Sequence, residues 1–177
     1  MSATQERCAA ALEGLEVTWR DAADGMTTAS IRLEDVVAVA ERLRDRAGFE
    51  VCTLITAIDL FPETPRFEMT WQLQSITHAD RVRLNAFAAG DPATAPSVTG
   101  LWPGAAYYER ECYDLMGVGF EGHQDFHGRD NLRRILMPEA FEHHPLRKDF
   151  PHQGIEPDKL YKRWDKARRE AEPQPGN

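Results

Sequence analysis

A dense run of charged side chains occurs at Glu109-Arg110-Glu111 and is followed by Asp114. On a helix, residues three or four apart share a face, so Arg110, Glu111 and Asp114 are expected to meet. Two carboxylates beside a guanidinium could serve acid–base chemistry, with the arginine keeping one carboxylate ionised. The same spacing is typical of an ion-pair network that locks a helix to a neighbour. The sequence favours the network, because no nucleophile accompanies the carboxylates.

Histidines follow this run. His123 and His127 are four residues apart with Asp125 between them. Imidazole and carboxylate groups together suit zinc. Gly122 and Gly128 argue against the rigid helix that would bring both histidines to one face. Polar loop histidines that bond to the backbone are therefore favoured, and a metal-dependent enzyme that uses these histidines with the carboxylates is the alternative.

Two basic pairs come next, Arg133-Arg134 and Arg147-Lys148. A phosphate or nucleic-acid site needs glycine-rich backbone or stacking aromatics nearby, and neither pair has them. The sequence also contains no dinucleotide fingerprint, Walker A motif or nucleophile elbow. Both pairs are expected to contact acidic groups, either on this chain or on a partner.

Charge is distributed unevenly along the 177 residues, whose net charge is −8. Residues 1–118 hold 10 Lys and Arg against 18 Asp and Glu, whereas residues 119–177 hold 11 of each sign. An acidic chain without a basic face is a poor nucleic-acid binder, because phosphate contacts need clustered lysine and arginine. The length suits one domain.

Other classes of protein also conflict with the sequence. The longest uncharged apolar stretch, residues 51–58, is far shorter than the ~20 residues of a membrane span. Glu6-Arg7 lies where an apolar signal region would begin. Three widely spaced cysteines indicate neither a disulfide scaffold nor an iron–sulfur or zinc site, and they are expected to be reduced: Cys8, Cys52 and Cys112.

Alternation of apolar and polar residues indicates the strands. The alternation over 67–74 and again over 81–86 predicts an antiparallel hairpin. The nearly continuous apolar run 49–61 favours a central strand buried on both faces. Shorter alternating runs predict half-buried strands at 15–20 and 29–33.

Helical periodicity is clearest over 34–47, where Val36, Ala40, Leu43 and Ala47 share one face. Further helices are expected at 4–13, 102–116 and 158–171. Together these elements predict an α+β fold with a small, mostly antiparallel sheet and helices packed on it, followed by a long extended C-terminal arm.

The division predicted is an α+β domain at 1–118 and an arm at 119–177 that ends in a helix. The arm is rich in charge and poor in core residues, so its apolar side chains need a partner to cover them. Examples are Phe141, Leu146, Phe150 and Trp164. We therefore expect an arm that wraps a partner, and an N-terminal domain that stays folded when residues 119–177 are removed.

Four segments carry a resemblance to a known family: 96–105, 108–117, 132–139 and 144–151. They read PSVTGLWPGA, YERECYDLMG, LRRILMPE and HPLRKDFP. In this order they resemble the thirty-kilodalton subunit family of respiratory complex I, the NADH:quinone oxidoreductase. The resemblance covers roughly residues 36–151.

The chain departs from the family pattern at a few places. An apparent insertion of about six residues within 124–131 separates Gly122-His123 from Leu132. His143 stands where glycine is usual, and Ala106 where asparagine is common. These departures concern the geometry of loops.

The resemblance implies a protein without an active site or a cofactor of its own. FMN, iron–sulfur clusters and quinone are expected in partner subunits, and NAD as the electron-donor couple of the complex. The expected partners are the large subunit that builds the quinone cavity (the forty-nine-kilodalton type) and adjacent subunits of the peripheral arm, on the cytoplasmic side of the cell membrane. The family also occurs in membrane-bound hydrogenases and in complexes with other donors, and an equivalent role in such a complex is the alternative.

No residue is assigned a catalytic, cofactor-binding or metal-binding role. The residues expected at structural or partner interfaces are Glu109, Arg110, Glu111, Asp114, Gly117, Arg133, Arg134, Pro145, Leu146, Arg147, Lys148 and Asp149.

Overall fold

The computed structural model describes residues 2–139, 141–151 and 154. Its helices are α1 (Ala3–Ala11), the 3-10 turn η1 (Leu33–Asp35), α2 (Val36–Ala47) and α3 (Ala105–Met116). Its strands are β1 (Val17–Arg20), β2 (Thr27–Ile31), β3 (Val51–Asp59), β4 (Phe67–Ser75), β5 (Asp80–Ala88), β6 (Thr94–Pro96) and β7 (Gly119–Glu121).

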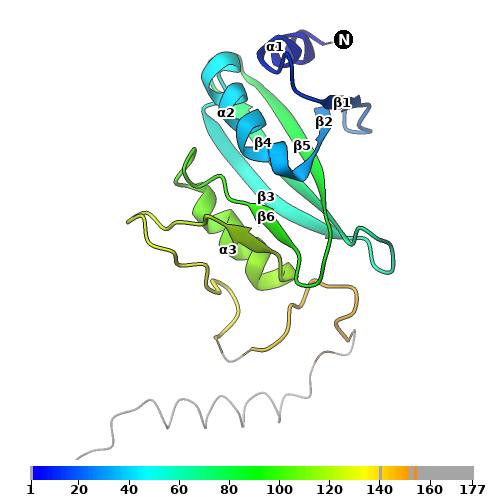
Figure 1. The fold of residues 1–177 in the computed structure, drawn as a ribbon, viewed down its shortest axis with the longest axis vertical. Coiled ribbons are helices and arrows are strands. Elements are labelled where there is room, and N and C mark those ends of the chain that lie inside the picture. Colours follow the sequence, from blue (N-terminus) through cyan, green and yellow to red (C-terminus); the bar gives the residue numbers. More distant parts are fainter. Residues whose placement is uncertain (1, 140, 152–153, 155–177) are drawn as a thin grey trace, which may run out of the picture.

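Five strands form the main sheet in the order β1-β2-β5-β4-β3 (Figure 1). The predicted hairpin is present as β4 and β5, paired antiparallel from Phe67↔Ala88 to Ser75↔Asp80. All neighbouring pairs in this sheet are antiparallel except β2–β5. The expected α+β class with a mostly antiparallel sheet is therefore confirmed.

The prediction that residues 49–61 form a central strand is wrong. β3 is an edge strand, with β4 as its neighbour in the sheet, and Ile58 on it is 50% exposed. Its apolar residues have another cause: α3 packs along β3, so that Cys52, Ile55 and Ala57 are buried. An apolar run indicates that a segment is buried. It does not distinguish a strand covered by a helix from a strand that lies between two others.

The helix over 36–47 packs as its periodicity predicted. Val36, Ala40, Leu43 and Ala47 are all buried, and they join a core that includes Trp71 and Leu84 of the hairpin. α2 ends at Gly48, whose φ of 69° belongs to the left-handed region that glycine adopts without strain.

The sequence did not predict β6 and β7. Residues 94–96 and 119–121 form a short parallel pair, and Phe120 and His123 are 5% and 2% exposed. These contacts favour an end of the folded unit a few residues beyond 118, and the division at that residue stays a prediction. The expected terminal helix at 158–171 lies outside the described residues.

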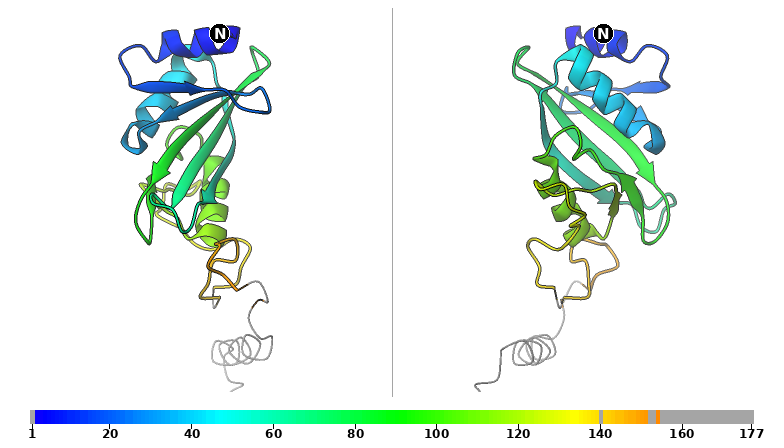
Figure 2. Two further views of the ribbon diagram at one scale, coloured as in Figure 1. Left: turned by 90° about the vertical axis from the view of Figure 1, so that its right-hand side faces the viewer. Right: turned by 60° about the vertical axis from the view of Figure 1, so that its left-hand side comes forward.

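The described part of the arm from 122 to 151 lies beside α3, away from α1 and α2 (Figure 2). Where it is described, this stretch contains no helix or strand. Leu146 N–H donates to the carbonyl of Leu115 at 3.0 Å, so the arm returns to the end of α3. Among the described residues, no helix combines the length and the apolar character needed to cross a membrane.

Candidate functional site: α3 and the arm

Helix α3 carries three carboxylates that lie in different environments. Glu109 and Asp114 are each 0% exposed, whereas Glu111 is exposed. The helix ends at Gly117, where φ is 77° and a Cβ would approach the His144 ring to 2.7 Å. Gly117 is therefore required both by its backbone conformation and by the arm that packs against it.

Asp114 organises the arm through main-chain contacts. Its Oδ2 accepts hydrogen bonds from the N–H groups of Ile135, Leu136 and Met137 at 3.0, 2.7 and 2.7 Å. Its Oδ1 accepts from Arg134 Nη1 at 2.7 Å. Burial by itself raises the pKa of Asp114, but the N–H groups and Arg134 outweigh it and hold the pKa below its usual value.

Arg110, Glu111 and Asp114 were expected to contact one another, and that prediction is wrong. Arg110 donates instead to the carbonyls of Arg133 and Arg134, at 3.1 and 2.9 Å. Glu111 has no hydrogen bond or ion pair within the described part of the chain. Asp114 instead binds residues that come some twenty positions later in the chain. The spacing of residues along one helix cannot reveal such distant partners.

Glu109 belongs to a separate buried group. Its carboxylate accepts from the Val98 N–H at 2.8 Å and from Ser97 Oγ at 2.8 Å, and it contacts His123 Nδ1 at 2.7 Å. His123 thus contacts a carboxylate, and the expected bond to the backbone is not what holds it. His127 lies on an exposed loop. The described residues contain no group of three or more His, Cys, Asp or Glu placed to hold a metal.

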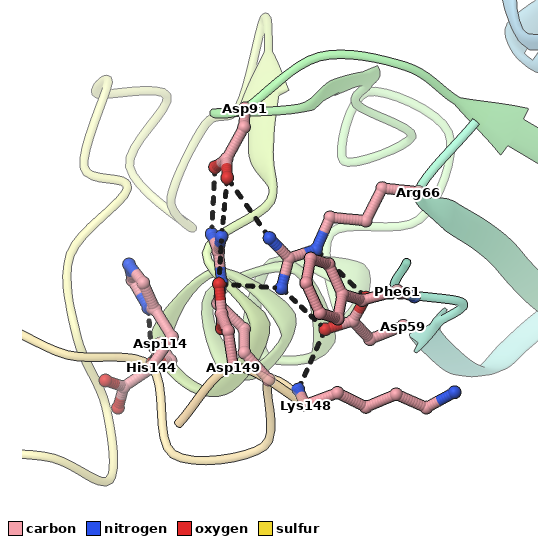
Figure 3. A network of polar contacts seen from close by, with 9 residues as sticks. Asp59, Phe61, Arg66, Asp91, Asp114, His144, Lys148 and Asp149 are labelled. Atoms are coloured by element: carbon pink, nitrogen blue, oxygen red, sulfur yellow. Dashed lines mark hydrogen bonds and ion pairs between the residues drawn. The ribbon is translucent and has the colours of Figure 1, made fainter. Parts of the chain in front are cut away.

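A second network, which we call the clasp, joins the sheet to the arm (Figure 3). It consists of Asp59, Arg66, Asp91, Arg147 and Asp149. The Arg66 guanidinium contacts Asp59 at 2.8 Å and Asp149 at 3.0 Å. The Arg147 guanidinium contacts Asp91 at 2.6 Å and Asp149 at 3.1 Å. The expectation that Arg147 pairs with acidic groups is met here within the chain itself.

Asp59 is the most buried carboxylate of the clasp, at 4% exposed. It also accepts hydrogen bonds from the N–H groups of Phe61 and Lys148, at 3.0 and 2.9 Å. Burial raises the pKa of Asp59, but Arg66 and these two N–H groups prevail and lower it to about 2. The Lys148 side chain leads away from the clasp (Figure 3), so Asp59 binds the main chain of the arm and leaves the amine outside.

We expect the clasp to weaken between about pH 4 and pH 2. Because the pKa of Asp59 falls from 3.8 to about 2 on folding, its contribution is complete above the unfolded value and is lost as the pH falls through the folded value. The shift corresponds to about 2 kcal/mol. Urea unfolding of wild type and Asp59→Asn should differ by this amount at pH 5 and converge near pH 2. Parallel curves would contradict the assignment, and Asp45→Asn on the exposed face of α2 is the control.

The remaining predicted residues lie along the same part of the arm. Arg134 is inside the Asp114 network, whereas Arg133 is exposed. Pro145 is half-buried. Leu146 is 60% exposed although its N–H is bonded to α3. Leu136 is 62% exposed although its N–H is bonded to Asp114.

The contacts of this site hold the arm against α3. Glu109 and Asp114 are buried, and each accepts several hydrogen bonds from neighbouring segments. Burial raises the pKa of all three cysteine thiols to about 12, so none is a thiolate at neutral pH. What the arrangement does is hold an extended arm in one conformation while Leu136 and Leu146 stay in solvent.

Sequence reasoning missed several residues of the site. Asp59, Arg66 and Asp91 were not singled out, because each is a single charge at a strand end or in a loop. The available signal was Asp59 itself, an acidic residue that closes an apolar run and is followed by arginine seven positions later. A charge in that position needs a partner if the strand end is covered.

Comparison with known proteins bears on the same region. Residues 29–156 match the family described as "Respiratory-chain NADH dehydrogenase, 30 Kd subunit". An NADH-quinone oxidoreductase subunit of Geotalea uraniireducens is 39% identical over 130 residues, which are 73% of this chain and 76% of that one. Its counterpart in Rhizobium meliloti is 41% identical over 141 residues, or 78% and 73% of the two chains.

Two solved structures share the fold. A trypsin-resistant fragment of Nqo5 matches with a TM-score of 0.55 and 27% identity, over 62% of this chain and 89% of the fragment. A protein of the membrane-bound sulfane sulfur reductase, an archaeal respiratory membrane complex, matches with a TM-score of 0.65 and 20% identity, over 97% and 95%. With the family match and the curated relatives, these findings show that the chain belongs to the family of the 30 Kd subunit of respiratory-chain NADH dehydrogenase.

Proposed function

We propose that this chain is a non-catalytic scaffold subunit in the peripheral arm of complex I, a proton-translocating NADH:quinone oxidoreductase. In this role it supports the passage of electrons from NADH to quinone while FMN, iron–sulfur clusters and quinone are bound by other subunits. Its place is on the cytoplasmic side of the cell membrane, where it is held through the complex. Family membership supports the proposal.

The observation that carries the scaffold role is that hydrogen bonds to α3 fix the arm while two of its leucine side chains stay exposed. Leu136 and Leu146 are about 60% exposed, yet their N–H groups are bonded to α3. Because both leucines are fixed at adjacent residues of α3, Asp114 and Leu115, we take them as the centre of an apolar patch that a partner covers. We assign this surface to the contact with the large subunit of the quinone cavity, the forty-nine-kilodalton type.

An equivalent role in a respiratory complex with another electron donor is the second candidate. It is favoured by the fold shared with the archaeal sulfur-reducing complex, a likeness that concerns architecture alone. The donor distinguishes the two. A complex purified through this chain should oxidise NADH under the first proposal, and it should require a different donor, such as hydrogen, under the second.

The scaffold role predicts that Leu136→Asp combined with Leu146→Asp abolishes assembly of the complex. The stability of the chain by itself should change by less than about 0.5 kcal/mol, because both side chains are already in water. Co-purification with the large subunit and urea unfolding measure the two effects. Ile76→Asp is the matched control, since Ile76 is 67% exposed at the other end of the molecule. Normal assembly of the double variant would show that these leucines do not form the interface.

A further inference from the structure

A pocket of about 210 Å³ lies between the outer face of α3 and the loop at 124–131. Its aromatic wall is made by Tyr107 and Phe126, whose ring centroids are 5.8 Å apart. These rings are 52% and 60% exposed. The pocket therefore presents two large aromatic surfaces to solvent at a site that the scaffold role has not used.

Three arginines and one carboxylate also line the pocket: Arg110, Arg129, Arg133 and Asp125. The carboxylate is already occupied, because Asp125 contacts the Arg129 guanidinium at 2.9 Å and accepts from the N–H groups of His127 and Arg129 at 2.8 and 3.0 Å. Arg110 donates to two main-chain carbonyls, which leave its charge unneutralised. The Arg133 side chain has no partner within the described residues.

The pocket is thus positive on a chain whose net charge is −8. Arginine and aromatic residues together are the residue types enriched at the centres of protein interfaces. A planar guanidinium recognises a carboxylate with two parallel hydrogen bonds. The volume is below the roughly 300 Å³ of most small-molecule sites, so it suits a single side chain.

A phosphate group is a poorer fit to the same pocket. Phosphate sites in proteins use free main-chain N–H groups from a loop or helix terminus. Here the loop N–H groups of His127 and Arg129 are taken by Asp125. What remains available is arginine charge and exposed aromatic surface.

We propose that this pocket binds an acidic segment of a neighbouring subunit, with one Asp or Glu side chain of that neighbour between Arg110 and Arg133. Apolar residues beside that carboxylate pack on Tyr107 and Phe126. The inference rests on the proposed function, because the neighbour belongs to the same complex. It adds a second attachment point, built partly from the apparent insertion within 124–131.

Photo-cross-linking in the assembled complex tests this proposal. A photoreactive phenylalanine derivative replaces Phe126 in the full chain, the complex is purified through a tag on the chain, and cross-linked products are identified by mass spectrometry. The expected product is one peptide of another subunit that contains Asp or Glu. The same derivative at Ile76, which is similarly exposed but lies in the β4–β5 turn, is the control.

Charge reversal makes the test specific. Arg133→Glu should lower the cross-link yield about tenfold, because it places two carboxylates together where a pair is expected. Replacing the identified partner carboxylate by lysine should restore the yield in that variant. The Arg133 side chain makes no hydrogen bond or ion pair within the described residues, so the fold of the chain should be unaffected.

The outcomes separate this inference from the proposed function. A complex that forms normally but gives no peptide cross-link at position 126, or a cross-link to lipid or to a peptide without acidic residues, overturns the pocket assignment alone. An unchanged yield in Arg133→Glu does the same. Failure of the wild-type chain to co-purify with any complex overturns both.

Discussion

Replacing Asp114 by asparagine should lower the free energy of unfolding by about 3–5 kcal/mol. The substitution removes the partner of Arg134, a side chain that is only 11% exposed. It also exchanges an acceptor of several hydrogen bonds for a group that carries its own N–H donors. Whichever way the amide turns, its N–H donors would face either the N–H groups of residues 135–137 or the Arg134 guanidinium, and neither can accept them.

The arm should detach from α3 before the whole chain unfolds. In Asp114→Asn, trypsin should cleave after Arg133 and Arg134 at least tenfold faster than in wild type, because the arm leaves α3. Urea unfolding gives the stability, and Glu111→Gln on the same helix is the control, since Glu111 is exposed and without a partner in the described chain. A change below about 1 kcal/mol would mean that the arm is not anchored by this carboxylate.

Ending the chain at residue 118 should have a still larger effect than any single substitution. The sequence led us to expect a folded domain from residues 1–118, and that division stays a prediction. The contacts made by the arm lead us to expect the opposite result. Removal of the arm takes β7 away from β6. It also removes every donor to the Asp114 carboxylate, the His123 contact of Glu109 and the Lys148 N–H donor of Asp59. A carboxylate that stays buried after losing its donors costs up to several kcal/mol.

We therefore expect the 1–118 chain to be unfolded or aggregated, and a chain that ends at residue 154 to unfold cooperatively. Circular dichroism and urea titration of the two chains side by side measure this difference. Changing Glu109 to glutamine and Asp114 to asparagine within the 1–118 chain tests the cause, because neutral side chains should recover part of the lost stability. A stable, cooperative 1–118 chain would instead restore the simple division into a domain and an arm.

Local patterns in the sequence were sufficient where the physics is local. The hairpin of β4 and β5 and the buried face of α2 follow from periods of 2 and 3.6 residues, because side-chain direction depends on backbone geometry alone. The expected end of a helix at residue 116 is also met, because Gly117 adopts a φ of 77° that glycine reaches without strain. The family resemblance was also available from sequence, since its signatures are runs of contiguous residues.

The partners of the buried carboxylates were not available from sequence. Asp114 binds main-chain N–H groups. Nearly every residue has such a group, so the sequence does not mark which residues will bind the carboxylate. Glu109 and His123 are fourteen positions apart on different elements, so no helical or strand period relates them. The clasp is more extreme, since Asp59 and Lys148 are 89 positions apart.

The sequence by itself determined the helices and strands other than β6 and β7 among the described residues, the fold class and the family. Only the tertiary structure decided that β3 lies at the edge of the sheet and that the arm is fastened by buried carboxylates. It also decided that the arm holds Leu136 and Leu146 in solvent. The reason is physical: elements arise from interactions between near neighbours in the chain, whereas a charge is buried only where distant segments supply its donors.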